Sequence, residues 1–357
     1  MKTVFKCLLI LFLLLSSFFP FMQDHSIHAA ETSINLSFTP NDTAIDPAKP
    51  VIYMTKLGSK TLYAVNYSTG VIRTLTLPYP AERLDLKNNK LYVTQLKMSH
   101  TSYGTAPYMG AIAEVDTETF TVSSTMDINT DPYDIAVDNN GYIYIAPGSG
   151  QWENLKVYSM KDKIEITQTS SNTTMYERTN IFYNAENSKI YATDTTLSPI
   201  DIEAYEIDNG VIKNHYDSPY HGDYAIGVSG KFSTDGMSYY NNGGFVFDLA
   251  AFQSGDMTYN FSFGKKYRDF EFSQDDQLTF AASATTGIDV YQLGSNKFLY
   301  SLRKDLNVQK LHYQDGILIA INKDSNGNNF IETINADTLP SNGLPTTPGI
   351  ADPAGTI

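Results

Sequence analysis

The sequence predicts an all-β fold, a seven-bladed β-propeller of four-stranded antiparallel blades, and three repeated features support this prediction. The first is a strand of alternating residue types that recurs about seven times along the 357 residues, most clearly at Lys90–Leu96 (KLYVTQL). Its copies are separated by 39, 52, 47, 47, 41 and 39 residues. A period of this length with several short strands per repeat is typical of propellers. The aligned third residues are Tyr53, Tyr92, Tyr144, Tyr191, Ser238, Thr279 and Leu318.

The second feature is a tight turn between the two outer strands of each repeat, as at 67–72 (YSTGVI) and 207–212 (IDNGVI). Gly, Asn and Asp favour such hairpin turns. The third feature is a short strand with a polar turn before each KLYVT-like strand, as at 83–90 (RLDLKNNK). Each repeat therefore has an inner, a second, a third and an outer strand. The first apolar residues after the turns keep the same period, and they are Val71, Phe120, Ile164, Val211, Met257 and Phe298.

The two ends of the repeat array predict how the ring closes. The seventh repeat has an inner strand at 311–313, a second at 317–321 and a third at 329–334, but no outer strand. The chain has a spare strand, Ile34–Phe38 (INLSF), before the first repeat. Pairing this strand with the last blade would cover two strand edges that are otherwise exposed. We therefore predict that the N-terminal strand closes the last blade.

The first 29 residues are typical of a secretory signal peptide. Two lysines precede Cys7–Met22, an apolar run of 16 residues, and small residues follow near Ala29. The alternative, an uncleaved membrane anchor, needs about 20 apolar residues. The Pro-, Gly- and Thr-rich end is typical of a disordered tail or linker. The predicted division is a signal peptide at 1–29, a propeller at 30–336 and a tail at 337–357.

The predicted mature chain is acidic and has no cysteine. Its only cysteine, Cys7, lies in the leader, so no disulfide or thiolate metal site is expected. Two of the 25 basic and one of the 39 acidic residues lie in the leader, which leaves 23 and 38 and a net charge of −15. Such a surface repels phosphate backbones, so nucleic acid is not an expected partner. We expect a secreted or cell-surface monomer, not membrane-spanning after cleavage, that meets a glycan, peptide or protein.

The segment Leu91-Tyr92-Val93-Thr94 resembles the repeat signature of the YVTN-type propellers, which are secreted and surface-layer-associated proteins. The tetrapeptide is intact once, with looser versions at 52–55 and 190–193, and the spacing pattern covers most of 34–335. The resemblance implies a seven-bladed fold and a cell-surface setting. It implies no single activity, because propellers include binding proteins, lyases, lactonases and quinoproteins.

Loops that join second to third strands share one face of the ring with the loops between blades, and we call this the loop face. Aromatic side chains there can cover apolar sugar or peptide surfaces, and arginines can fix orientation. Alternatively, Arg83, Arg178 and Arg268 pair with neighbouring carboxylates and hold the ring together. The candidate ligand-binding residues are Arg83, Tyr103, Tyr108, Trp152, Tyr176, Arg178, His221, Tyr267 and Arg268.

The sequence supports enzymatic catalysis less than it supports ligand binding. No nucleophile elbow, zinc-protease motif or phosphate loop is present, and no catalytic residue is predicted. His215 and His221 flank one blade junction, where they form an acid–base pair, half a metal site or two surface residues. The first hypothesis is therefore a non-enzymatic binding protein. The alternative is a lactonase- or lyase-like enzyme with a metal at the mouth of the channel.

One segment has the oxygen donors of a weak calcium site, and calcium is the only cofactor that the sequence suggests. The donors stand at positions 1, 3, 5 and 9 of the segment that begins at Asp324, and hard cations prefer such ligands. An Asn- and Gly-rich hairpin loop explains the same residues. The candidate metal ligands are Asp324, Asn326, Asn328 and Glu332.

Overall fold

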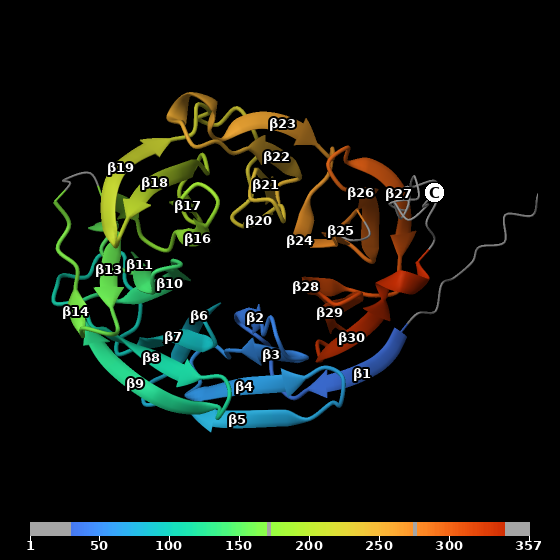
Figure 1. The fold of residues 1–357 in the computed structure, drawn as a ribbon, viewed down its shortest axis with the longest axis horizontal. Coiled ribbons are helices and arrows are strands. Elements are labelled where there is room, and N and C mark those ends of the chain that lie inside the picture. The colour runs from blue at the N-terminus through green and yellow to red at the C-terminus, as the bar shows by residue number, and fades with distance from the viewer. Residues whose placement is uncertain (1–29, 170–172, 274–276, 340–357) are drawn as a thin grey trace, which may run out of the picture.

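A computed structural model describes residues 30–169, 173–273 and 277–339, and it shows seven four-stranded antiparallel sheets around a central axis (Figure 1). The predicted all-β seven-bladed propeller is confirmed. The predicted signal peptide at 1–29 lies outside the described residues, as does nearly all of the predicted tail. The described residues include the short 3-10 helices η2 (Gln253–Gly255) and η3 (Ala336–Thr338). No helix among them has the length and apolar character needed to span a membrane.

Each blade runs from an inner strand near the axis to an outer strand at the rim (Figure 1). Blade one comprises β2 (Thr43–Ile45), β3 (Val51–Met54), β4 (Thr61–Asn66) and β5 (Ile72–Thr76). Blade two comprises β6 (Ala81–Lys87), β7 (Lys90–Leu96), β8 (Gly110–Asp116) and β9 (Thr121–Ile128). Blade three comprises β10 (Pro132–Val137), β11 (Tyr142–Pro147), β13 (Lys156–Ser159) and β14 (Ile164–Glu165).

The remaining blades repeat this order. Blade four comprises β16 (Asn180–Asn184), β17 (Lys189–Thr193), β18 (Ile202–Asp208) and β19 (Val211–Asp217). Blade five comprises β20 (Gly230–Phe232), β21 (Ser238–Asn241), β22 (Phe245–Asp248) and β23 (Thr258–Ser262). Blade six comprises β24 (Tyr267–Ser273), β25 (Leu278–Ser283), β26 (Ile288–Gln292) and β27 (Lys297–Leu302). Blade seven comprises β28 (Val308–Gln314), β29 (Ile317–Lys323), β30 (Asn329–Asn335) and β1 (Ala30–Leu36).

The N-terminal strand closes the ring as predicted. Strand β1 pairs antiparallel with β30, so that Ile34 lies opposite Ile331 and Leu36 opposite Asn329. In Figure 1 the blue β1 lies along the red β30 at the rim of blade seven. The strand spans Ala30–Leu36 rather than Ile34–Phe38. Phe38 leaves the strand and stacks on a tyrosine of blade one, with ring centroids 3.7 Å apart.

Because every blade lies between two others, both faces of its central strands are buried. Strand β7 is buried from Leu91 through Gln95, for example. The repeated tyrosine fills the space between blades. In three blades its hydroxyl donates to an aspartate: Tyr53 to Asp46 at 2.9 Å, Tyr144 to Asp138 at 3.2 Å and Tyr191 to Asp256 at 2.8 Å. In blade five the tyrosine that packs against blade four is Tyr239, one residue after Ser238, the position that the repeat spacing predicts.

Adjacent inner strands are joined by hydrogen bonds at all seven blade interfaces, and we call these bonds the inner ring. At four interfaces an aspartate of one inner strand, or just before it, accepts a backbone N–H of the next. These bonds are Asp42–Leu84 at 2.9 Å, Asp85–Val137 at 2.7 Å, Asp134–Ile181 at 2.8 Å and Asp269–Leu311 at 2.9 Å. The other three interfaces use Asn180 with the Val228 carbonyl, Lys231 with Glu271, and Thr43 with His312.

Candidate functional site

A small ribbon that the sequence did not predict stands on the loop face between blades three and four. It consists of β12 (Trp152–Asn154) and β15 (Thr174–Tyr176), which pair antiparallel. Trp152 lies opposite Tyr176, and their rings meet edge to face with centroids 5.1 Å apart. Cross-strand aromatic pairs of this kind stabilise short ribbons. The pair holds the indole in place while leaving it 57% exposed.

The long loop between β7 and β8 packs against this ribbon. Thr101 donates its backbone N–H to the Ser149 hydroxyl at 2.8 Å, and Ser102 donates its hydroxyl to Glu177. Glu177 also accepts the backbone N–H of Gln151 at 2.9 Å. The structure therefore brings Tyr103, Trp152 and Tyr176 into one sector of the loop face, and we call these three residues the aromatic ledge.

Two further predicted residues lie in the same sector but serve the loops themselves. The Tyr108 hydroxyl donates to the Gly104 carbonyl at 2.7 Å, within its own loop. Arg178 has a left-handed backbone (φ 60°), and its Nε donates to the Gly148 carbonyl at 3.3 Å. Both contacts stabilise the loops that carry the aromatic ledge.

The other predicted ligand-binding residues lie away from the ledge. His221 is 80% exposed at the junction of blades four and five, with Nδ1 2.7 Å from the Asp201 carboxylate. Tyr267 is only 3% exposed, because β24 turns its side chain between strands, where the hydroxyl donates to Asp289 at 3.0 Å. Arg268 extends toward blade seven and donates to the Val308 carbonyl at 2.9 Å. His221, Tyr267 and Arg268 thus bind three different partners, and these contacts do not bring the three side chains together.

Two of the three arginines, Arg83 and Arg268, join neighbouring blades, but they do so through neutral oxygen acceptors rather than the expected carboxylates. Arg83 joins blade two to blade three through the Tyr133 hydroxyl at 3.3 Å, and Arg268 joins blade six to blade seven. Neither arginine, nor Arg178, forms an ion pair with any residue that the structure describes. Carbonyl and hydroxyl oxygens take the place of the expected carboxylates.

Three of the four predicted calcium ligands, Asp324, Asn326 and Asn328, lie in the hairpin loop between β29 and β30. The Asp324 carboxylate accepts backbone N–H groups of Asn326 and Asn328 at 2.8 Å each, and the side-chain amide of Asn328 at 2.9 Å. Glu332 lies within β30, where Arg303 forms an ion pair with it. Loop amides and an arginine thus occupy the two carboxylates. This arrangement favours the hairpin interpretation.

Blade four carries a second group with metal-ligand chemistry, at Glu203, His215 and Asp217. The His215 Nε2 lies 3.1 Å from a Glu203 oxygen and 3.9 Å from an Asp217 oxygen. Its Nδ1 is buried and has no hydrogen-bond partner among the described residues. A metal-bound imidazole almost always donates its second N–H to an acceptor. We therefore interpret the group as a hydrogen-bonded cluster. His215 and His221 pair with different carboxylates, so these contacts do not make them an acid–base pair.

A half-buried histidine fixes the base of the long loop. His100 Nδ1 lies 2.6 Å from Asp131 and Nε2 lies 3.2 Å from Glu82. Burial lowers the pKa of His100, but the bonds to both carboxylates outweigh it and raise the pKa to about 9. Ser149 donates its hydroxyl to Asp131 and not to the imidazole. Because nucleophilic serine catalysis needs the serine on the histidine, this cluster is structural.

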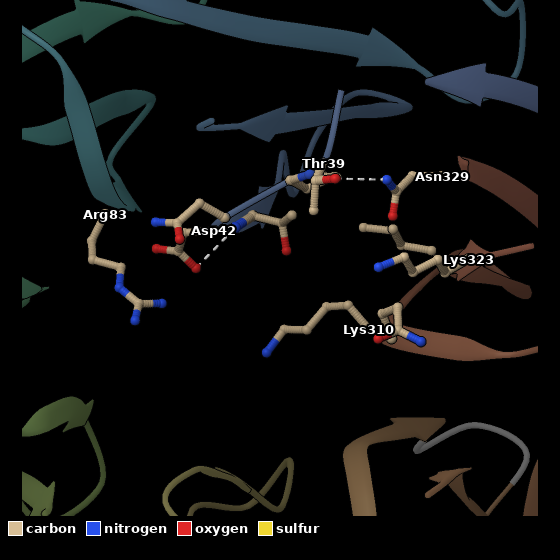
Figure 2. A pocket seen from close by; sticks show the side chains of 11 residues that line it. Thr39, Asp42, Arg83, Lys310, Lys323 and Asn329 are labelled. Carbon is tan, nitrogen blue, oxygen red and sulfur yellow. Dashed lines mark hydrogen bonds between the residues drawn. The ribbon is translucent and has the colours of Figure 1, made fainter. Parts of the chain in front are cut away.

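A cavity of about 220 Å³ opens near the axis between blades seven, one and two, and we call it the axial mouth (Figure 2). Its charged lining comprises Asp42, Arg83, Lys310 and Lys323. Figure 2 shows Arg83 and Lys310 extending into the same space from opposite sides, with Asp42 between them. Of these residues, only Arg83 is among those predicted from the sequence. The others come from the two ends of the chain, and ring closure brings them together.

The groups at the axial mouth differ in how fully they are paired. Asp42 accepts two backbone N–H groups, from Thr43 and Leu84, at 2.9 Å each. Lys310 Nζ lies 3.4 Å from Asp269, and the charge of Asp269 raises the pKa of Lys310. The guanidinium of Arg83 stands over the Tyr133 ring, 5.1 Å from its centroid, and its Nε has no hydrogen-bond partner among the described residues. Burial lowers the pKa of Arg83, but the charges of Asp134 and Asp42 more than offset it, so Arg83 is cationic.

No known family model matches this chain, and no curated protein sequence matches it. The seven-bladed fold therefore rests on the structure itself. The resemblance of its repeat to the YVTN-type propellers stays a prediction, as do secretion and the cell-surface setting.

Proposed function

We propose that this protein is a secreted or cell-surface, non-enzymatic propeller, similar to the YVTN type, that binds a glycan, peptide or protein partner on its loop face. The observation that carries the proposal is the aromatic ledge, where Tyr103 is 89% and Trp152 57% exposed. Large aromatic side chains gain more from burial than most residues, and their faces cover the apolar faces of sugars and peptides. An exposed pair on one sector is therefore a contact surface for a ligand.

The ledge is held in place before any ligand arrives. The β12–β15 ribbon fixes Trp152, and the Tyr205 hydroxyl of blade four donates to the Thr174 carbonyl of β15 at 3.0 Å. The loop that carries Tyr103 is tied to the same ribbon through Glu177. A surface that is already ordered loses less conformational entropy on binding, and this favours affinity.

The test is an array of immobilised glycans and peptides probed with the full chain and with Trp152→Ala. We expect one ligand class to bind, and the substitution to weaken that binding about tenfold, as for a buried aromatic anchor. Phe252→Ala is the matched control, since Phe252 is 81% exposed on the β22–β23 connection, at the other face of the ring. Equal losses for the two variants would contradict the proposal, as would the absence of any bound class.

The axial mouth gives no support to the alternative, a metal-dependent lactonase or lyase. Divalent cations need several oxygen ligands. Within the described residues, Asp42 is the one carboxylate that lines the mouth, both of its oxygens accept backbone N–H groups, and three cationic side chains surround it. This lining repels a divalent cation.

A further inference from the structure

The axial mouth has a surplus of positive charge in an acidic protein. Arg83, Lys310 and Lys323 line it against the single carboxylate Asp42, whereas the whole chain carries a formal charge of −14. The deeper channel cavity of about 520 Å³ shares Asp42, Arg83 and Lys310 with the mouth, but its further carboxylates balance the charge, with four acidic residues against four lysines and arginines. The excess of cations over carboxylates is therefore found in the lining of the mouth. A cleft with this local sign attracts anions from solution.

Two of the three cations are not paired with a carboxylate. Arg83 donates to a tyrosine hydroxyl and retains a free Nε, and exposed Lys323 forms no ion pair with any described residue. Arginine matches a carboxylate with two parallel N–H donors. The mouth can therefore bind a carboxylate without breaking an ion pair of the ring.

Neutral groups beside these cations point to a ligand with hydroxyl groups. Asn41, Gln309 and Asn329 each donate their side-chain amide within the protein, to Glu82, Asn307 and Thr39 respectively. Their side-chain carbonyl oxygens accept no hydrogen bond from the described residues. Such oxygens accept hydroxyl protons, which a simple carboxylate such as acetate does not offer.

The size of the mouth limits what enters. Sites for drug-sized ligands have volumes of about 300–1,000 Å³. At about 220 Å³ the mouth admits a single residue of a larger molecule, such as one sugar ring. A longer chain would extend from it across the loop face.

We propose that the axial mouth binds one carboxylated sugar residue, a hexuronic acid, of an acidic glycan. Arg83 binds its carboxylate, Lys323 donates to a hydroxyl group from the opposite side of the mouth (Figure 2), Lys310 adds positive charge, and the amide oxygens of Asn41, Gln309 and Asn329 accept its hydroxyl groups. This inference rests on the proposed binding function of the loop face, for which it names the ligand class, but it concerns a separate cavity from the aromatic ledge.

The test is isothermal titration calorimetry of the full chain with glucuronate, glucose, acetate and triglycine. We expect glucuronate to bind more tightly than the other three. Lys323→Gln and Arg83→Gln should each weaken glucuronate about tenfold, since a hydrogen bond to a charged group contributes about that much. Lys87→Gln is the matched control, because this substitution removes one positive charge at the other end of β6, away from the mouth.

Glucuronate binding that is no tighter than acetate or triglycine would overturn the inference in favour of a simple anion site or a peptide site. No glucuronate binding, or equal losses in Lys323→Gln and Lys87→Gln, would also overturn it. If Arg83→Gln fails to fold, the exposed Lys323 still gives a test. Trp152→Ala should retain glucuronate binding, so that a failed ledge and a failed mouth give different results.

Discussion

The Asp42 carboxylate accepts the backbone N–H of Leu84 at 2.9 Å, so a residue just before the inner strand of blade one is bonded to the inner strand of blade two. A backbone group is thereby satisfied where two sheets meet edge to edge near the axis. The same device recurs at Asp85, Asp134 and Asp269. The propeller is therefore held at its centre by side chains as well as by packing.

Removing one member of the inner ring should destabilise the whole fold. We expect Asp42→Ala to lower the free energy of unfolding by about 1–3 kcal/mol, since the N–H of Leu84 loses its acceptor. Asp42→Asn keeps an acceptor oxygen and should cost less. Urea denaturation of both variants measures the difference. An alanine variant as stable as the asparagine variant would show that this bond does not matter.

The closing strand should depend on its buried face. Leu36 is 5% exposed in β1, while its neighbour Asn35 faces solvent. We expect Leu36→Ala to lower the free energy of unfolding by about 2–4 kcal/mol through lost burial and a cavity. Asn35→Ala should change it by less than about 0.5 kcal/mol. Similar thermal unfolding temperatures for the two variants would argue against a closed ring in solution.

The half-buried His100 should make stability fall at alkaline pH. Its folded pKa of about 9 lies above the ordinary 6.5, so the folded state holds the proton more tightly. The resulting stability is fully present below about pH 6.5 and is lost as pH rises through 9, with an upper limit of about 3 kcal/mol. Wild type and His100→Asn should therefore differ at pH 6 and converge above pH 9. A difference that does not change with pH would exclude the ion pairs as its cause.

Asp85 should have a pH effect in a lower range. Burial raises the pKa of Asp85 from 3.8 to about 7, against hydrogen bonds from Val137 and Leu86. The folded state therefore favours the protonated acid, and this contribution is lost as pH rises from about 4 through 7. Asp85→Asn keeps an acceptor without the charge, so it should be more stable than wild type at pH 8 and not at pH 4. Chemical denaturation at both values gives the test, and equal stability at pH 8 would contradict it.

The blades could be predicted from sequence because each is a local unit. The turn at Asn209 and Gly210, for example, adopts positive φ values of 50° and 78°, which Asn and Gly accept most readily. Ring closure was also predictable, since an unpaired strand at one end matched a missing strand at the other. In blade five, two adjacent tyrosines obscured the alternation: both are buried, and only their packing shows that Tyr239 lies toward blade four and Tyr240 toward blade six.

The candidate sites could be predicted only in part, because they depend on distant contacts. Trp152 and Tyr176 lie opposite each other, but two strands of blade three separate them in sequence. Asp42 and Lys310 share the axial mouth only because the ring closes. Tyr267 was predicted to bind ligand because it lies at a blade junction, where exposure is expected. It is instead the buried first residue of β24, and its side chain points into the interior.

The pairing of β1 with β30 sets an order of events for a chain that is made from its first residue to its last. The first strand of the propeller emerges from the ribosome well before its partner, and until then its hydrogen-bonding edge stays open. A product that stops short of β30 would leave blade seven with neither its third strand nor a place for its fourth. The ring can therefore close only after the last blade has been synthesised.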